Sequence, residues 1–243
     1  AGALAEAVRM NHPEWSVSSM AAGGEAIMVS KRIAGEVDFF FGRSSRALEI
    51  ETQAPLHPDI DFGAATQYQL VMPFSMSYVH LLASLETGLM SIRDIVERRY
   101  PYRFGSGAGV TRLLFSKALE YYGVSLEEAE SWGASHETVV ISSTEGVEAI
   151  KAARVNLGLT WTPVPSPVFM GSGLYVRLLP VDDPGLVSLY ESLGCVPVVI
   201  PAGTYSFADK DIHTVAGPYP VVVRPDMPED VVYEVVKAAF EHS

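Results

Sequence analysis

Two stretches of the chain share one order of elements, and this repetition constrains the fold most. Residues 16–42 (SVSSMAAGGEAIMVSKRIAGEVDFFFG) and 138–161 (TVVISSTEGVEAIKAARVNLGLTW) each pass from a strand pattern through a polar turn and a helical pattern to a second strand. Such connections join parallel strands and place helices on the faces of the sheet. The repetition therefore predicts an α/β fold with two lobes. Ligands of open α/β sheets bind outside the carboxyl ends of the strands, so two facing lobes would form a ligand cleft.

The rest of the chain alternates in the same way. Ser91 with Asp94 three residues later is typical of a helix start, and Pro184 suits the first turn of another helix. We expect helices over 4–10, 25–35, 91–99, 143–155 and 183–194, and strands over 15–20, 37–42, 68–74, 78–84, 137–142, 155–161, 175–181 and 196–201. A last strand and a terminal helix are expected within 219–242.

Composition excludes several classes of function. A net charge of -12 and a pI near 4.9 argue against nucleic acid as a partner, because the chain offers no basic run to neutralise phosphates. No segment reaches the roughly 18 uncharged apolar residues of a membrane span. Cys195 is the single cysteine, so it forms no internal disulfide. The six histidines show no metal-binding spacing and no GxSxG motif is present, so we expect no metal, no cofactor and no catalytic nucleophile.

The stretch RFGSGAGVTRLLFSKALEYYG, residues 103–123, places a run of glycine and serine directly before a helical pattern. Unpaired N–H groups and the positive end of the helix dipole meet at such a start, and Ser106 adds a hydroxyl donor. No lysine follows Gly109, so the stretch is not a nucleotide-binding P-loop. It indicates either a site for a small carboxylate or phosphate, or a tight turn.

Several segments resemble the TAXI-type solute receptors of TRAP transporters. These are MAAGGEAIMVSKRIAGEVDFFFGRSSRALE, FGSGAGVTRLLFSKALEYYG, TWTPVPSPV and the tail that begins IPAGTYSFADKDIH. The resemblance implies a type II periplasmic binding protein fold, with two α/β lobes joined by hinge strands around a ligand cleft. It also implies a periplasmic or extracytoplasmic, non-enzymatic receptor. Such a receptor captures a glutamate-like amino acid or a C4 or C5 dicarboxylate and delivers it to a TRAP membrane permease.

The resemblance also suggests how the chain divides. We expect lobe one in 1–75, lobe two in 76–180, and a return segment in 181–243 whose terminal helix packs back on lobe one. The family begins with a strand and a Gly-Gly-Tyr loop that this chain lacks; either the chain is trimmed, or the strand is truly missing and lobe one loses a central strand. The start at AGALAEAV, without an initiator Met or an apolar leader, fits a processed or trimmed protein whose export signal has been removed. The family also has Ser-Gly-Thr where this chain has Ala108, Gly109 and Val110. We expect a monomer.

The candidate ligand-binding residues follow the predicted carboxyl ends of strands. Bare backbone could donate N–H groups at the two N-terminal glycines, the serines supply hydroxyls, the arginines could bind a carboxylate bidentately, and the tryptophan could cover an apolar part of the ligand. Each position also has a structural interpretation, as a turn, a helix cap, a solvated surface residue or part of the core. The set comprises Gly23, Gly24, Arg43, Ser44, Ser106, Gly107, Ala108, Gly109, Val110, Arg112, Trp161 and Thr162.

Three alternatives keep the same fold. The chain could be a ligand-sensing domain, a small-molecule enzyme, or a receptor serving an ATP-driven importer. An enzyme would need a titratable pair in the cleft, for which Asp38, Glu145 and Lys151 could be proposed. Their positions in strand or helix patterns favour packing and solvent roles.

Overall fold

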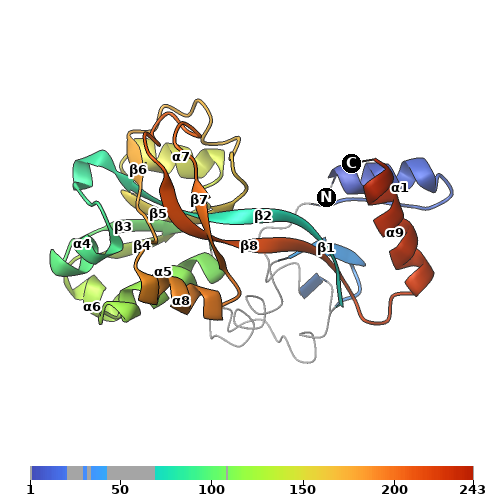
Figure 1. Cartoon of the computed structure of the whole chain (residues 1–243), viewed down its shortest axis with the longest axis horizontal. Coiled ribbons are helices and arrows are strands. Elements are labelled where there is room, and N and C mark those ends of the chain that lie inside the picture. Colours follow the sequence, from blue (N-terminus) through green and yellow to red (C-terminus); the bar gives the residue numbers. More distant parts are fainter. Residues whose placement is uncertain (1, 21–29, 32–33, 43–68, 108, 243) are drawn as a thin grey trace. The chain divides into compact units, whose positions relative to one another are not determined.

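The computed structural model describes residues 2–20, 30–31, 34–42, 69–107 and 109–242. The chain divides into two compact units, one formed by residues 1–75 with 219–243 and the other by residues 76–218. Two long strands, β2 (Gln69–Ser84) and β8 (Ile212–Val223), each begin in one unit and end in the other. Each unit is described by itself below (Figure 1).

The first unit has a core of two helices and three strands. Helices α1 (Gly2–Asn11) and α9 (Glu229–Glu241) come from opposite ends of the sequence. Strand β1 (Phe39–Phe41) pairs antiparallel with β8. The buried side chains shared by these elements are Leu4, Ala7, Val8, Met72, Val221, Val235 and Ala238. Apolar burial between α1 and α9 therefore joins the two ends of the chain within one unit.

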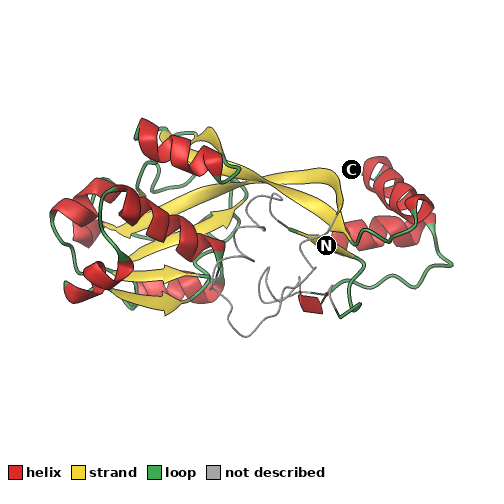
Figure 2. Cartoon of the chain, turned by 90° about the horizontal axis from the view of Figure 1, so that it is seen from below, coloured by secondary structure: helices red, strands yellow, loops and turns green. Residues whose placement is uncertain are grey.

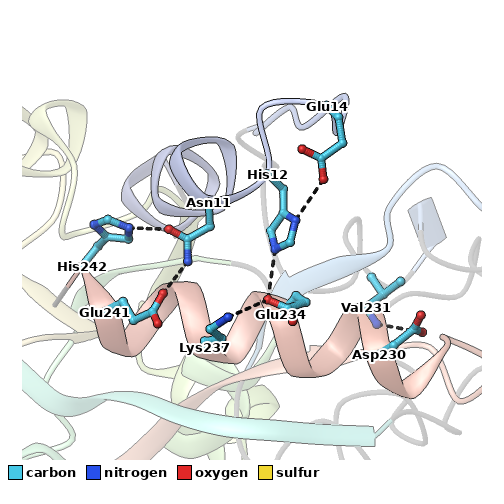
Figure 3. A network of polar contacts seen from close by, with 9 residues as sticks. All are labelled: Asn11, His12, Glu14, Asp230, Val231, Glu234, Lys237, Glu241 and His242. Carbon is cyan, nitrogen blue, oxygen red and sulfur yellow. Dashed lines mark hydrogen bonds and ion pairs between the residues drawn. The ribbon is translucent and has the colours of Figure 1, made fainter.

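Polar contacts reinforce the α1–α9 pair (Figure 3). His12 Nε2 lies 3.1 Å from a carboxylate oxygen of Glu234, and His12 Nδ1 lies 3.1 Å from one of Glu14. Asn11 Nδ2 donates to Glu241 at 2.6 Å. Hydrogen bonding to Glu14, followed by that to Glu234, raises the pKa of His12 above its ordinary value. The protonated imidazole is therefore favoured between the two acids.

The second unit contains a mixed sheet with a parallel core. Strands β3 (Arg103–Ser106), β4 (Ser135–Thr138) and β5 (Leu157–Thr162) are parallel, with β3 in the middle. Strand β5 pairs antiparallel with β2. Strands β6 (Val176–Leu178) and β7 (Val196–Ile200) pair with β2 and β8, respectively. The predicted α/β fold with parallel strands joined through helices is confirmed.

Helices cover both faces of this sheet. Figures 1 and 2 show α5 (Val110–Tyr121) and α8 (Pro184–Ser192) on one face and α7 (Thr144–Lys151) on the other. Phe104 of β3 stacks on Phe115 of α5 with ring centroids 3.9 Å apart. On the opposite face, Val147 and Ile150 of α7 belong to a buried cluster with Ile141. The remaining helices are α4 (Ile92–Glu97), α6 (Leu126–Ser131) and the 3₁₀ turn η2 (Leu85–Thr87).

Some predicted elements are wrong in extent. The two strands expected over 68–74 and 78–84 are one strand, β2. The connecting residues Ser75, Met76 and Ser77 include no glycine, proline, asparagine or aspartate to form a tight turn. The strand expected over 137–142 lies two to four residues earlier, as β4. Residues 16–20 form no ladder with any strand in the described ranges, so the strand expected over 15–20 is absent there. Helix α6 was not predicted, and most of the helix expected over 25–35 lies outside the described residues.

Candidate functional site

The three parallel strands of the second unit end at one edge of the sheet. Ser106, the last residue of β3, pairs with Thr138 of β4 and with Leu159 of β5. Helix α5 begins four residues after the end of β3, and α7 begins six residues after the end of β4. The carboxyl ends of the strands and the amino ends of two helices therefore gather at this edge, where α/β proteins bind ligands.

The start of α5 differs from the other helix starts of this unit. Gly109 stands at its N-cap with φ +85° and offers no side chain to accept a hydrogen bond. The first intrahelical bond runs from Leu113 N–H to Gly109 O at 3.1 Å, so the amides of residues 110–112 have no carbonyl acceptor within the helix. The other α-helices that the structure describes in this unit begin with a side chain that accepts from the first turn; these caps are Ser91, Ser125, Ser143 and Asp183.

Ser106 lies beneath this open helix start. Side chains alternate along a strand, so Ser106 points to the same face as Phe104, which packs on α5. The residue is only 4% exposed. Its Oγ makes no hydrogen bond to a described residue, yet it does not count among the fully buried side-chain atoms that lack a partner. The Ser106 hydroxyl and the first-turn amides that have no carbonyl acceptor within the helix thus lie at the same end of α5, and together they could bind a carboxylate or another anion.

Different structural constraints act on the three glycines Gly105, Gly107 and Gly109. A Cβ at Gly105 would lie 2.7 Å from Ile141 Cδ1, and one at its β5 partner Gly158 would lie 2.8 Å from the same atom. Both glycines therefore make room for a buried isoleucine. Gly109 has the positive φ that favours glycine. A Cβ at Gly107 would have its nearest neighbours at 3.7 Å, an ordinary contact, so packing does not explain this glycine.

The candidate residues of β5 are engaged within the protein. Trp161 is partly buried; its Nε1–H donates to Ser77 O, and its indole occupies the space that a side chain at Gly217 would need. Thr162 is buried and its Oγ1 donates to Ser166 Oγ at 3.3 Å. Alternation places Trp161 on the α5 face with Ser106 and Thr162 on the α7 face, so these two candidates do not point to one place.

Val110 and Arg112 occupy the first turn of α5, but only Val110 is buried. Arg112 is exposed, and its charge acts on buried groups nearer the amino ends of the strands. Burial lowers the pKa of His136, and the positive charge of Arg112 lowers it further. His136 pairs with Phe104 in the register, two residues before Ser106, and both of its ring nitrogens lack a hydrogen-bond partner.

The remaining candidates, Gly23, Gly24, Arg43, Ser44 and Ala108, lie outside the described residues. Of the alternatives for chemistry, Asp38 lies 3.7 Å from Arg224 in the first unit, whereas Glu145 and Lys151 are exposed on α7 in the second. Within the described ranges, no group of three or more His, Cys, Asp or Glu side chains is placed to hold a metal ion. None of the helices in those ranges combines the length and apolarity needed to cross a bilayer.

One buried polar group near this edge was not predicted. His80 of β2 is fully buried, with Nδ1 3.0 Å from Tyr78 O and Nε2 2.9 Å from Tyr205 Oη. Desolvation lowers the pKa of His80 to about 4, so the imidazole is neutral at pH 7. Tyr205 Oη also accepts from Ser166 N–H at 2.8 Å. The sequence signal for this group was the tyrosine of IPAGTY, but its partners are 125 and 39 residues away.

Solved structures with this fold are periplasmic binding proteins. The alkanesulfonate-binding protein SsuA from Xanthomonas axonopodis pv. citri, bound to MOPS, aligns with a TM-score of 0.54 and 12% identity over 98% of this chain and 66% of its own. A putative L-cystine ABC transporter protein from Listeria monocytogenes gives 0.57 and 11%, over 98% and 77%. A structure described as a periplasmic transporter gives 0.60 and 12%, over 99% and 76%. The chain thus spans about two thirds of the first protein's length and about three quarters of the others', and it has the periplasmic binding protein fold.

The family follows from a sequence match. The model of the NMT1-like family matches residues 54–243, which is most of the chain. This protein therefore belongs to the NMT1-like family. No curated protein sequence matches it.

Proposed function

We propose that this protein is a solute-binding receptor that holds the anionic group of a small molecule at the start of α5. The observation that carries the proposal is the coincidence of an uncapped helix start with Ser106, a largely buried residue whose hydroxyl makes no hydrogen bond to a described residue. The first-turn amides of residues 110–112 and Ser106 Oγ would donate to the same anion. No titratable group is needed in this arrangement, so the proposed role is binding without a chemical step.

The ligand class that we propose is a small carboxylate, either a glutamate-like amino acid or a C4 or C5 dicarboxylate. It rests on the resemblance to TAXI-type receptors and on the neutral donors at α5, which suit a carboxylate. Several proteins of this fold bind charged small molecules; SsuA holds MOPS, and a substrate-binding protein from Streptococcus pneumoniae, with a TM-score of 0.52 and 10% identity, holds histidine. These relatives support an anionic or zwitterionic ligand in general.

We also propose which kind of membrane transporter receives the solute from this protein. The resemblance favours a TRAP permease driven by an ion gradient, whereas two of the proteins that share the fold are described with ABC transporters. Uptake by proteoliposomes distinguishes these partners. Transport that requires the receptor and an ion gradient would support TRAP, and transport that requires ATP would support an importer of the other class.

We further propose a periplasmic or extracytoplasmic monomer that binds by closure of two lobes. The lobes would be the two compact units, residues 1–75 with 219–243 and residues 76–218. Of the expected return segment 181–243, only the part from 219 onward would then belong to lobe one, and the long strands β2 and β8 would act as hinges. Small-angle scattering with and without ligand would test this, because closure decreases the radius of gyration of a monomer. An unchanged radius at saturating ligand would contradict closure.

A thermal-shift screen tests the ligand class. The compounds are glutamate, glutamine, 2-oxoglutarate, succinate, fumarate, phosphate and 3-(N-morpholino)propanesulfonate, with dimethyl 2-oxoglutarate as a control that lacks both carboxylates. A ligand at one hundred times its Kd adds about 2.7 kcal/mol of apparent stability. We expect a selective increase in Tm with one carboxylate, none with the ester, and recovery of the compound unchanged. A protein stabilised by none of the carboxylates, or one that converts them, would contradict the proposal.

A further inference from the structure

The segment that follows β5 has few backbone donors with which to hold its place. Residues 163–167 read Pro-Val-Pro-Ser-Pro, so only Val164 and Ser166 carry an N–H group. A segment with so few donors cannot be fixed by a ladder of backbone hydrogen bonds. Its position therefore depends on apolar packing, in which Val164 contacts a buried cluster, and on the few polar contacts that it makes.

The Ser166 amide is buried and donates to a side chain instead of a carbonyl. Its acceptor is Tyr205 Oη, 2.8 Å away. Ser166 Oγ in turn accepts from Thr162 Oγ1 at 3.3 Å, which connects the segment to the last residue of β5. Tyr205 itself is 2% exposed, and its ring stacks on Phe207 with centroids 5.1 Å apart.

The hydrogen-bond directions in this group are determined by the carbonyl at one end. Tyr78 O can only accept, so His80 Nδ1 carries the proton and His80 Nε2 is an acceptor. The Tyr205 hydroxyl therefore donates to Nε2 while its oxygen accepts from Ser166 N–H. One phenol oxygen thus serves both partners, and phenylalanine would leave a buried amide and a buried imidazole nitrogen unsatisfied.

We propose that Tyr205 is the positioning residue for the carboxyl end of β5, because its hydroxyl holds the 163–167 segment against His80 of β2. The proposal rests on the proposed function for its consequence, since β5 ends at the edge where we place the ligand. In this role Tyr205 acts through Ser166 and Thr162 and touches no ligand itself.

The test compares Tyr205→Phe with a matched control, Tyr190→Phe. Tyr190 is fully buried in the same unit, and its hydroxyl donates to Leu114 O at 2.8 Å, so the control loses a buried hydroxyl elsewhere. We expect wild-type Ser166 N–H to exchange slowly with solvent, and Tyr205→Phe to increase this rate roughly tenfold or more while Tyr190→Phe does not. The ¹⁵Nε2 resonance of His80 should shift in Tyr205→Phe alone.

Calorimetry with L-glutamate measures the consequence for binding. We expect Tyr205→Phe to weaken binding roughly tenfold and Tyr190→Phe to leave it unchanged. Fast exchange of Ser166 N–H in the wild type, equal exchange in both variants, or equal glutamate affinity in wild type and Tyr205→Phe would overturn the positioning role. If wild type does not bind glutamate, the proposed ligand fails, while the exchange rates and the His80 resonance still decide whether Tyr205 holds the segment.

Discussion

The starts of α5 and α7 lie at the same edge of the second unit's sheet, but they are built differently. Helix α7 is closed by its own sequence: Ser143 Oγ accepts from Gly146 N–H at 3.1 Å and donates to Val140 O at 2.7 Å. Helix α5 begins at Gly109 without a side-chain cap. A helix start that satisfies its own amides needs no ligand, whereas an open start above a buried hydroxyl can gain from one.

The glycines show the same difference. A Cβ at Gly146 in the first turn of α7 would overlap Val140 O and lie 2.5 Å from Ile141 Cα. A Cβ at Gly107, before α5, would meet no atom of the described residues closer than 3.7 Å. The start of α7 is therefore tightly packed against neighbouring backbone, whereas the loop before α5 has space for an additional group. This difference agrees with the proposal that α5 binds the ligand while α7 supports the sheet, and four substitutions test the distinction.

The largest effect is expected from Gly146→Ala. The added methyl group would collide with backbone atoms, which cannot rotate away, so we expect the free energy of unfolding to fall by about 3 kcal/mol. Denaturant unfolding followed by circular dichroism measures this loss. Gly185→Ala is the matched control in the first turn of α8, where the methyl group would meet the hydroxyl of Tyr121. This exposed side chain can move at the cost of its hydrogen bond to Asp183, which is a smaller loss than a collision with backbone. Equal losses in the two variants would contradict the tight packing of α7.

Helix starts were the part of the fold that the sequence predicted best. Ser91, Ser143 and Pro184 are local signals, and helices α4, α7 and α8 begin where those residues indicate. Strand lengths were predicted less well because pairing partners determine them. Strand β2 continues through Ser75–Ser77 and, in the second unit, is paired with β5 and β6, which are distant in sequence.

The candidate site was predictable only in part. The run of glycines before an expected helix indicated the α5 start, but the role of Gly105 depends on Ile141, 36 residues later. That the Ser106 hydroxyl makes no hydrogen bond to a described residue, and that Trp161 packs against Gly217, are likewise results of tertiary structure. A sequence pattern can nominate a hydroxyl or an indole, whereas only the fold determines whether the protein already uses it.

The second prediction concerns Ser106→Ala, which should separate binding from stability. The hydroxyl has no hydrogen bond to a described residue, so its removal should change the free energy of unfolding by less than about 0.5 kcal/mol. It should weaken binding of the carboxylate identified by the thermal-shift screen roughly tenfold, because one donor to the anion is lost. Calorimetry and denaturant unfolding measure the two quantities.

Ser116→Ala on α5 is the control for Ser106→Ala. Its hydroxyl donates to Leu113 O at 2.9 Å, two turns into the helix, and its loss should not affect binding. A binding loss in Ser116→Ala equal to that in Ser106→Ala would remove Ser106 from the site, as would unchanged affinity in Ser106→Ala.

The third prediction is that Ser143→Ala, unlike Ser106→Ala, lowers stability and leaves ligand affinity unchanged. Loss of an N-cap serine costs about 1 kcal/mol of stability, because the Gly146 amide loses its acceptor. We expect no change in carboxylate affinity, since α7 does not contribute to the proposed site. Ser143→Asp, which restores an acceptor at the cap, should recover the stability. A variant that keeps its stability but loses affinity would place the ligand at α7 instead of α5.

The smallest effect on stability is expected from Gly107→Ala, and it tests whether the space before α5 belongs to a ligand. The methyl group would have Thr111 Oγ1 and Val140 Cγ2 as its nearest neighbours, both at 3.7 Å, and Gly107 does not have a positive φ. The free energy of unfolding should therefore change by no more than about 0.5 kcal/mol. If an anion occupies the space between Ser106 and the first turn of α5, the methyl group should weaken its binding more than Ser143→Ala does. Calorimetry decides between the two explanations of this glycine, because full affinity in a stable Gly107→Ala protein would mean that the ligand does not approach the loop.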